Sequence, residues 1–333
     1  MRYLLTGAAG FIGAHLANEI SRNGDEVLGI DSYSDYYAIS LKKERVKTLL
    51  TSKEISLIEG DVRDLEIINQ LIQDFKPNVV IHLAAQPGVR IPISDLNKYT
   101  ESNLAGFCNV LSAVVRNSVP NFLYASSSSV YGEDSQTPFS EKETNLNPLS
   151  FYGATKLSNE ILTHSLIRNS STRARGLRFF TVYGPWGRPD MAYFRLAASA
   201  VSNVLFNKYG DGQVIRDFTY IKDVTEIVYS LSKQLTNYKP GFADIVNIGG
   251  GKPNSLNEMI TEIANISGTK LNLNSELGNL NDVKLTHADP KYLVSLINRK
   301  PEIELNTGLK SVLEWASKGD ISSKMANWTS SVV

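Results

Sequence analysis

Tyr152 and Lys156 stand four residues apart within residues 149–170, whose apolar spacing is typical of a helix, so both side chains share one helix face. A tyrosine with its ordinary pKa of about 10 is a poor base at neutral pH. Lowering that pKa by about 3 units takes roughly 4 kcal/mol of preferential stabilisation of the phenolate. A lysine ammonium one turn away could supply part of it. The pair is a candidate proton acceptor, although such a pair, taken alone, is most often an ordinary surface feature.

Four consecutive serines, residues 126–129, end a short apolar run that is typical of a buried strand. Their hydroxyls can bind and orient a ligand. With pKa values far above 7, they cannot readily act as general acids. The alternative is that they only hydrogen-bond the neighbouring backbone.

Gly7, Gly10 and Gly13 follow the first predicted strand and open the first predicted helix. This arrangement lets the backbone approach a pyrophosphate at a helix N-terminus. Asp31 ends the second strand, where a carboxylate accepts ribose hydroxyls and repels a 2′-phosphate, so the pattern favours NAD over NADP. The alternative is a tight turn with a helix-capping Asp. Asp61, after the third strand, would contact the adenine amino group or cap the next helix.

Short apolar strands alternate with helical patterns through the first half of the chain. Continuous apolar strands of this kind predict a parallel sheet that is covered on both faces. We therefore expect an α/β fold: a Rossmann-like, doubly wound parallel sheet with a smaller mixed α/β C-terminal substrate domain. The NAD-binding domain is predicted at 1–182 plus 214–248, where the chain returns to the sheet, and the smaller second domain at 183–213 plus 249–333.

The 333 residues carry a formal net charge of zero, so no global field would attract nucleic acid or an anionic membrane. The single cysteine, Cys108, excludes an internal disulfide and a zinc site built on thiolates, and it is expected in the core. The four histidines are scattered, and no metal site is expected. No apolar run of about 18 residues and no signal peptide are evident, which leads us to expect a cytoplasmic protein.

The glycine-rich turn, the serine-rich strand end and a Tyr-x-x-x-Lys about 25 residues later resemble the short-chain dehydrogenase/reductase superfamily. The length and second domain are similar to its extended branch, which acts on nucleotide sugars. Segments 31–46, 83–90, 176–191 and 216–224 closely resemble the UDP-glucuronate 4-epimerases. The resemblance covers essentially the whole chain.

The resemblance implies that Ser127, four residues before Tyr131, is the catalytic hydroxyl, with Tyr152 as the base and Lys156 as its partner. It also implies a set of residues that contact bound NAD. These are Gly7, Gly10, Phe11, Ile12, Gly13, Asp31, Asp61, Val62, Leu83, Ala84, Ala85, Tyr152 and Lys156.

By the family pattern, Arg216 would meet the diphosphate of a UDP-sugar, Arg188 would lie near its sugar or uridine end, and Thr181 would contact the sugar. The residues expected around the uronate carboxylate and along its pocket are Arg90, Ser128, Ser129, Pro87 and Val89. The remaining implied substrate contacts are Ser127 and Asp282. From Arg173 to Lys222 the chain has eight Lys or Arg and three Asp, an excess of positive charge that suits a diphosphate and a carboxylate.

In the related 4,6-dehydratases, the two positions after the catalytic hydroxyl carry Asp and Glu, and in UDP-glucuronate decarboxylases the second is Glu. Here they are Ser128 and Ser129, which argues against both reactions and leaves epimerisation at C4 through a 4-keto sugar. The expected reaction interconverts UDP-glucuronate and UDP-galacturonate. A UDP-hexose 4-epimerase is the runner-up, and a non-catalytic NAD-binding sensor is the alternative from a different class.

Three positions depart from the family pattern: Pro87 and Gly153 replace a common Ala, and Asn281 replaces a usual Gly. We expect none of them to touch Ser127, Tyr152 or Lys156. By resemblance, helices in 101–115 and 150–166 would pair with their copies in a homodimer.

Overall fold

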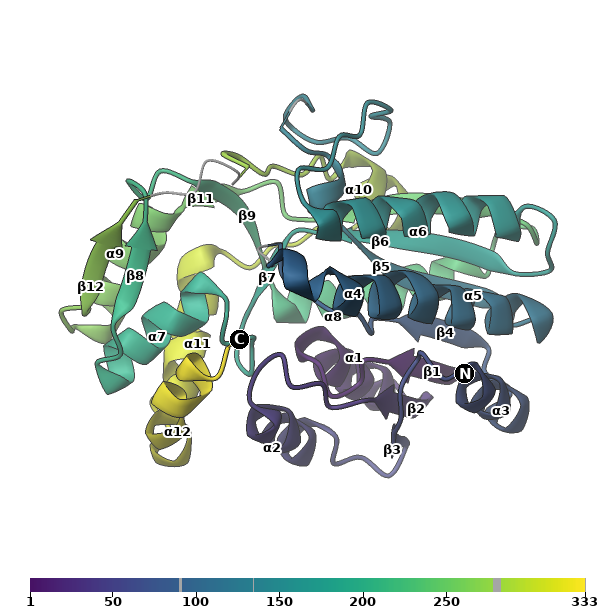
Figure 1. The fold of residues 1–333 in the computed structure, drawn as a ribbon, viewed down its shortest axis with the longest axis horizontal. Coiled ribbons are helices and arrows are strands. Elements are labelled where there is room, and N and C mark those ends of the chain that lie inside the picture. Colours follow the sequence, from purple (N-terminus) through teal and green to yellow (C-terminus); the bar gives the residue numbers. More distant parts are fainter. Residues whose placement is uncertain (90–91, 134, 278–282, 333) are drawn as a thin grey trace.

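A parallel sheet of seven strands forms the centre of the larger part of the molecule (Figure 1). The computed structural model describes residues 1–89, 92–133, 135–277 and 283–332. The strands lie in the order β3-β2-β1-β4-β5-β6-β10 and every neighbouring pair is parallel. Because the chain winds outward from β1 in both directions, the doubly wound sheet that the sequence predicts is confirmed. The strands are β1 (Arg2–Thr6), β2 (Glu26–Asp31), β3 (Ile55–Glu59), β4 (Val79–His82), β5 (Asn121–Ser127), β6 (Arg173–Phe179) and β10 (Ala243–Ile248).

Helices bury apolar stripes against both faces of this sheet, as parallel strands require. One apolar cluster joins the sheet to α1 (Phe11–Arg22), α8 (Ile221–Leu235) and α10 (Lys291–Ile297). A second cluster on the other face includes α3 (Leu65–Phe75), α5 (Phe107–Arg116) and the end of α6 (Phe151–Ile167). A segment of η1 (Ile93–Asp95), α4 (Leu96–Tyr99) and the π-helical η2 (Thr100–Gly106) leads into α5. In the described ranges, no helix has the length and apolarity needed to cross a bilayer.

A third apolar cluster forms the core of the smaller part of the molecule, on the left in Figure 1. It is built from two small sheets and four helices, and α2 (Ile39–Leu49) of the larger part also packs on it. The sheets are β7 (Thr181–Tyr183), β9 (Ile215–Tyr220) and β11 (Pro253–Ser255), and β8 (Phe206–Tyr209) with β12 (Leu273–Glu276). The helices are α7 (Ala192–Ser202), α9 (Leu256–Ser267), α11 (Leu305–Ala316) and α12 (Gly319–Ser330).

Less of the chain after residue 214 returns to the main sheet than the sequence suggests. We expected the stretch from residue 216 to rejoin that sheet, but only α8 and β10 do so. β9 pairs instead with β7 and β11, because β7 leaves the main sheet directly after β6 and offers its own edge.

Two buried aspartates fasten this smaller part. The Asp217 carboxylate accepts backbone N–H groups from Gly250, Gly251 and Ala288 at 2.8–3.0 Å. Asp223 accepts two more, from residues 302 and 303. These acids of segment 216–224 therefore hold loops in place, because each one satisfies backbone donors that burial would leave unpaired.

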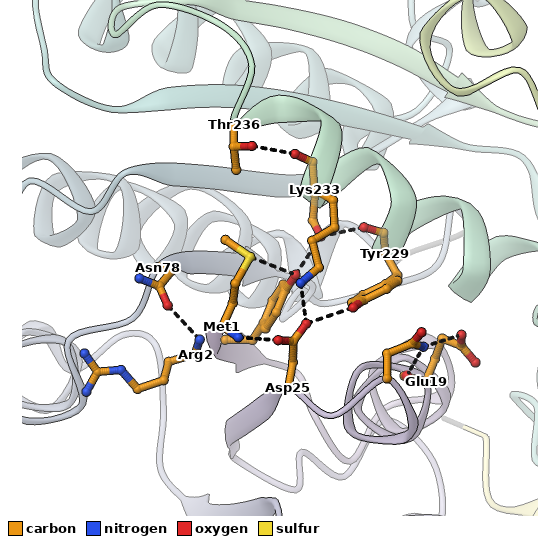
Figure 2. Close-up of polar contacts among 11 residues, drawn as sticks. Met1, Arg2, Glu19, Asp25, Asn78, Tyr229, Lys233 and Thr236 are labelled. Carbon is orange, nitrogen blue, oxygen red and sulfur yellow. Dashed lines mark hydrogen bonds and ion pairs between the residues drawn. The ribbon is translucent and has the colours of Figure 1, made fainter.

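Asp25, in the turn between α1 and β2, ties the N-terminal strand to α8 (Figure 2). Its carboxylate contacts the Met1 amino group and accepts hydrogen bonds from Lys233 Nζ at 2.5 Å and Tyr229 Oη at 2.8 Å. Burial acts to raise the pKa of Asp25. The hydrogen bonds from Lys233, Met1 and Tyr229 outweigh it and hold the pKa below its usual value.

A depressed carboxyl pKa contributes stability that is present above the unfolded-state pKa and is lost as pH falls through the folded-state pKa. We expect Asp25→Asn to lower the free energy of unfolding by about 1–3 kcal/mol at pH 7. The gap between parent and variant should close as pH falls from 5 toward 2. Thermal unfolding at several pH values measures it, and a gap of constant size would contradict this role of Asp25.

Candidate active site

The predicted cofactor residues come together at the carboxyl ends of the parallel strands. Gly7 follows β1 and Gly10 is the N-cap of α1, where no side chain caps the first turn. A Cβ on Gly13 would lie 2.1 Å from the Gly7 carbonyl oxygen, so only glycine lets α1 start this close to β1. The free N–H groups around Phe11 and Ile12 give this turn the character of an anion site.

Gly7 lies where two loops cross. Its φ is +71°, and an added Cβ would sit 2.8 Å from the Ala84 backbone nitrogen, in the segment Leu83–Ala85 that follows β4. Thr6 also holds this segment, since its Oγ1 accepts from Ala84 N at 3.2 Å and its carbonyl oxygen accepts from Leu83 N. The predicted cofactor residues after β1 and β4 are therefore in direct contact at the switch point of the sheet.

We expect Gly7→Ala to lower the NAD content of the purified protein at least about tenfold, and stability by about 3 kcal/mol, because positive-φ strain adds to the clash with Ala84. Gly24→Ala is a matched control. Its φ is +79°, but no atom lies within 4 Å of the added Cβ, so only the strain remains, about 1 kcal/mol. Equal NAD content in the two variants would contradict the role of Gly7.

Asp31 is buried at the end of β2. Its Oδ2 accepts Ala9 N at 2.9 Å and its Oδ1 accepts Tyr33 N at 2.8 Å. The carboxylate thus organises the glycine-rich turn, and each oxygen keeps a lone pair with which to accept a ribose hydroxyl.

Asp61 does not cap the following helix, so that alternative is wrong. The N-cap of α3 is Asp64, which accepts from residues 66 and 67. Asp61 is instead paired with Arg63 at 2.8 Å. The neighbouring Val62 is buried and lies under Gly106, where an added Cβ would be 2.9 Å from Val62 Cγ2.

The four serines divide into two groups, because consecutive residues of a strand face opposite sides. Ser126 is buried and donates to Glu160 Oε1 of α6 at 2.5 Å, so its hydroxyl is held in the core. Ser127 Oγ accepts from Ser129 N and donates to Ser129 Oγ, both at 3.1 Å, and it caps the short helix η3 (Ser128–Val130). Ser128 and Ser129 are half-buried beside it.

Tyr152 and Lys156 lie on the first turns of α6, which Ser150 caps by accepting from Gly153 N. The Lys156 ammonium is 5.7 Å from the centre of the Tyr152 ring and donates to the Ala125 carbonyl oxygen of β5 at 3.0 Å. Helix α6 therefore places the Tyr–Lys pair against the strand that ends in the serines.

The charges around Tyr152 differ from the sequence expectation. Burial raises its pKa, while the Arg188 charge and a hydrogen bond with Ser127 act to lower it. Burial lowers the pKa of Lys156 to about 8. From the sequence we expected the Lys156 ammonium and the positive nicotinamide ring to favour the Tyr152 phenolate. The structure adds Arg188, more than 30 residues away along the chain.

Arg188, whose charge reaches Tyr152, forms an ion pair with Asp190. Tyr36, in the loop before α2, donates to Asp190 Oδ2 at 3.4 Å. Tyr99 donates to the Pro87 carbonyl oxygen at 2.7 Å and so holds the loop that carries the exposed Val89. The sequence did not single out Tyr36, Tyr99 or Asp190, although the first and last lie in family-like segments.

Thr181, the first residue of β7, is half-buried beyond the end of β6. Arg216 is half-buried on β9, and its Nη1 donates to the Ile215 carbonyl oxygen at 2.9 Å. Arg90, Asp282 and the unusual Asn281 lie outside the described residues, so the contacts expected of them stay predictions.

Part of the basic segment 173–222 has a structural role. Arg175 is buried in a pair with Asp244, and Arg178 in a pair with Glu160. The excess positive charge that the sequence shows is therefore only partly available to a ligand.

Cys108, expected in the core, is exposed on α5. Among the described residues, no three His, Cys, Asp or Glu side chains gather in a way that would hold a metal ion.

Gly153, where the family commonly has Ala, sits one residue after Tyr152. An added Cβ would lie 2.7 Å from the Ser129 carbonyl oxygen. The glycine lets the start of α6 approach the serine turn closely, so this departure from the family pattern lies in the wall of the site.

Comparison with known proteins agrees with this geometry. The family model described as NAD dependent epimerase/dehydratase family matches residues 3–249. The chain is 37% identical to protein CapI of Staphylococcus aureus (95% of this chain, 98% of that protein) and 38% identical to UDP-glucuronate 4-epimerase 2 of Arabidopsis thaliana (94% and 75%). The crystal structure of UDP-glucuronic acid 4-epimerase from Bacillus cereus, in complex with UDP-glucuronic acid and NAD, superposes with a TM-score of 0.87 at 34% identity (95% and 98%). The chain belongs to the NAD dependent epimerase/dehydratase family.

Proposed function

We propose that this protein is an NAD-dependent 4-epimerase that interconverts UDP-glucuronate and UDP-galacturonate. The observation that carries the proposal is the grouping of Ser127, Tyr152 and Lys156 at the end of β5, at the same end of the parallel sheet as the glycine-rich turn. The similarity to UDP-glucuronate 4-epimerases over nearly the whole chain supports it. Hydroxyls in place of carboxylic acids at Ser128 and Ser129 favour epimerisation over loss of water or of carbon dioxide.

Bound NAD would accept a hydride from C4 of the sugar and return it to the opposite face of the same carbon. Tyr152, as the phenolate, would take the proton of the 4-hydroxyl and give it back in the second half of the reaction. Ser127, which lies close enough to Tyr152 to act on its pKa, would hydrogen-bond the 4-oxygen and orient it. Burial raises the pKa of Tyr152, and the Arg188 charge only partly offsets this. The positive charge of the oxidised nicotinamide, together with the Lys156 ammonium, would supply the rest of the stabilisation that the phenolate needs.

The glycine-rich turn, with the uncapped first turn of α1, fits the pyrophosphate of the dinucleotide, and Asp31 fits its adenosine ribose. Arg216 would meet the diphosphate of the substrate. Rotation of the keto sugar about that diphosphate would present its other face to the hydride.

A 4-keto-uronate is a β-keto acid and loses carbon dioxide readily. Ser128, Ser129 and Thr181 would hold its carboxylate with neutral hydroxyls, which keep the carboxylate charged and fixed rather than protonated. This contact is what would separate an epimerase from a decarboxylase on the same fold.

The test is incubation of the purified protein with UDP-glucuronate and no added cofactor, followed by proton NMR of the anomeric signals. Formation of UDP-galacturonate, reaching the same ratio from either substrate, is expected. UDP-glucose in a parallel tube tests the runner-up, a UDP-hexose epimerase. Formation of a UDP-pentose would contradict our interpretation of the serines.

We also propose that two copies pair through α5 and α6. Ile161, Leu162 and Leu166 are large apolar side chains that lie 63%, 40% and 45% exposed along α6. A second copy would cover them, as the family-like helices lead us to expect.

The domain division stays a proposal: residues 1–182 plus 214–248 bind NAD, and 183–213 plus 249–333 bind the nucleotide sugar. The two apolar clusters support it except at β9, which pairs within the smaller part, and at α10, which packs on the main sheet. We also propose a cytoplasmic location, as expected from the sequence.

A further inference from the structure

The guanidinium of Arg45 on α2 is fully buried. The proposed mechanism gives this residue no role. Its donors reach backbone carbonyl oxygens in two distant segments. Nη1 donates to Ala9 O at 2.7 Å, Nε to Trp186 O at 2.8 Å and Nη2 to Gly187 O at 3.1 Å. The Tyr37 hydroxyl completes the set at 3.1 Å.

The charge of Arg45 has no acid beside it. Within the described ranges, no carboxylate lies within ion-pair distance of its guanidinium, in contrast to the buried Arg175 and Arg178. A buried cation without a counter-charge is costly, and neutral carbonyl oxygens offset that cost only when several are held in place. Arg45 is thus unlike the two arginines that serve the core.

The two segments that Arg45 joins both belong to the site. Ala9 is in the glycine-rich turn, between Gly7 and Gly10. Trp186 and Gly187 come directly before Arg188, in a stretch that is neither helix nor strand and so has no backbone ladder to fix it.

His15 on α1 completes the same attachment. Its Nε2 lies 2.9 Å from the Pro185 carbonyl oxygen and must carry the proton, because a carbonyl only accepts. Three successive carbonyl groups, those of Pro185, Trp186 and Gly187, are therefore bound by side chains of the NAD-binding part. The Trp186 ring packs on Trp315 and Trp328 of the smaller part, at 5.3 and 6.3 Å between ring centres.

We propose that Arg45 is a positioning residue: its guanidinium joins the glycine-rich turn to the segment 185–187 and so holds Arg188 where the substrate needs it. The proposal rests on the proposed function, because Arg188 is taken as a substrate contact. The geometry couples the cofactor turn to the substrate side through one side chain.

A double-mutant cycle tests this coupling. The Kd of UDP-glucuronate is measured by calorimetry on the NAD-loaded protein in a Tyr152→Phe background, which prevents turnover. Arg45→Met and Arg188→Met should each raise the Kd by about tenfold or more. The Kd of the double variant should lie within about threefold of the Kd of whichever single variant binds UDP-glucuronate more weakly. A Kd for Arg45→Met within twofold of the background, or losses that multiply in the double variant, would overturn the proposal.

Tryptophan fluorescence adds a readout that needs no ligand. The chain has three tryptophans, and all three lie in the Trp186 cluster. We expect Arg45→Met to shift the emission to longer wavelength, because segment 185–187 and its ring become more exposed to water. Arg175→Met is the control: an equally buried arginine far from this cluster, whose loss should lower the melting temperature with unchanged emission and less than a twofold change in Kd.

If Arg45→Met does not fold, Arg45→Lys replaces it in the cycle, since it keeps the charge and can still donate to one carbonyl. It should raise the Kd by a smaller factor, again without multiplying with Arg188→Met. If the background protein does not bind UDP-glucuronate at all, the proposed function fails, and the emission shift still decides the positioning. Emission from the Arg45 variant that matches the Arg175 control would overturn it.

Discussion

Replacing Tyr152 by Phe should slow epimerisation by about 10³-fold and leave the protein folded with NAD bound. The change removes one hydroxyl oxygen from a half-buried ring on the first turn of α6. Without the phenolate, no group at that position can take the proton of the 4-hydroxyl as the hydride leaves C4. The Lys156 bond to Ala125 does not involve that hydroxyl, so the cofactor side of the site should be unchanged.

Tyr131→Phe is the matched control. Its hydroxyl donates to Asn247 Oδ1 at 2.8 Å inside the core, close to the serine turn but away from Tyr152. Its loss should lower the melting temperature and leave the epimerisation rate within a few-fold of the parent. Initial rates and bound NAD are measured for both variants. Near-normal turnover by Tyr152→Phe would remove Tyr152 from the mechanism.

The largest loss of stability is expected when the buried pair of Glu160 and Arg178 is broken. The two side chains make two parallel hydrogen bonds at 2.8 and 2.9 Å, and both are nearly inaccessible to solvent. Ser126 donates to the same carboxylate. Arg178→Met leaves that carboxylate buried without a counter-charge, which should cost about 3–5 kcal/mol.

The double variant Glu160→Leu with Arg178→Met separates the pair's net value from the cost of breaking it. With no charge left uncompensated, we expect it to recover about half or more of the loss. Urea unfolding of the three variants gives the free energies. Losses that simply add in the double variant would show that the two side chains contribute independently, and would contradict the expected cost of an orphaned charge.

Much of the fold could be predicted because its signals are local. Continuous apolar strands, a glycine-rich turn and an Asp at the end of the second strand suffice for a doubly wound sheet with a nucleotide edge. The partner of β9 was missed for the opposite reason. The sequence of an apolar strand does not show which sheet the strand joins. Here β9 pairs with β7, which leaves the main sheet some 30 residues earlier in the chain.

The candidate site shows the same division. The family resemblance points to Ser127, Tyr152 and Lys156, and helix spacing puts the last two on one face of α6. Arg45, His15 and Asp190 could not be found this way. Their contacts join segments that are far apart in the chain, and nothing in a run of residues such as 39–49 shows that one arginine points into the protein.

The most direct test of the central claim uses UDP-glucuronate that carries deuterium at C4. Oxidation and re-reduction at that carbon by one bound NAD should invert it with the label retained, so the UDP-galacturonate formed in ordinary water should be deuterated at C4 when read by NMR and mass spectrometry. Replacement of the deuterium by solvent hydrogen, or a labelled UDP-pentose as the main product, would contradict 4-epimerisation by hydride transfer and return.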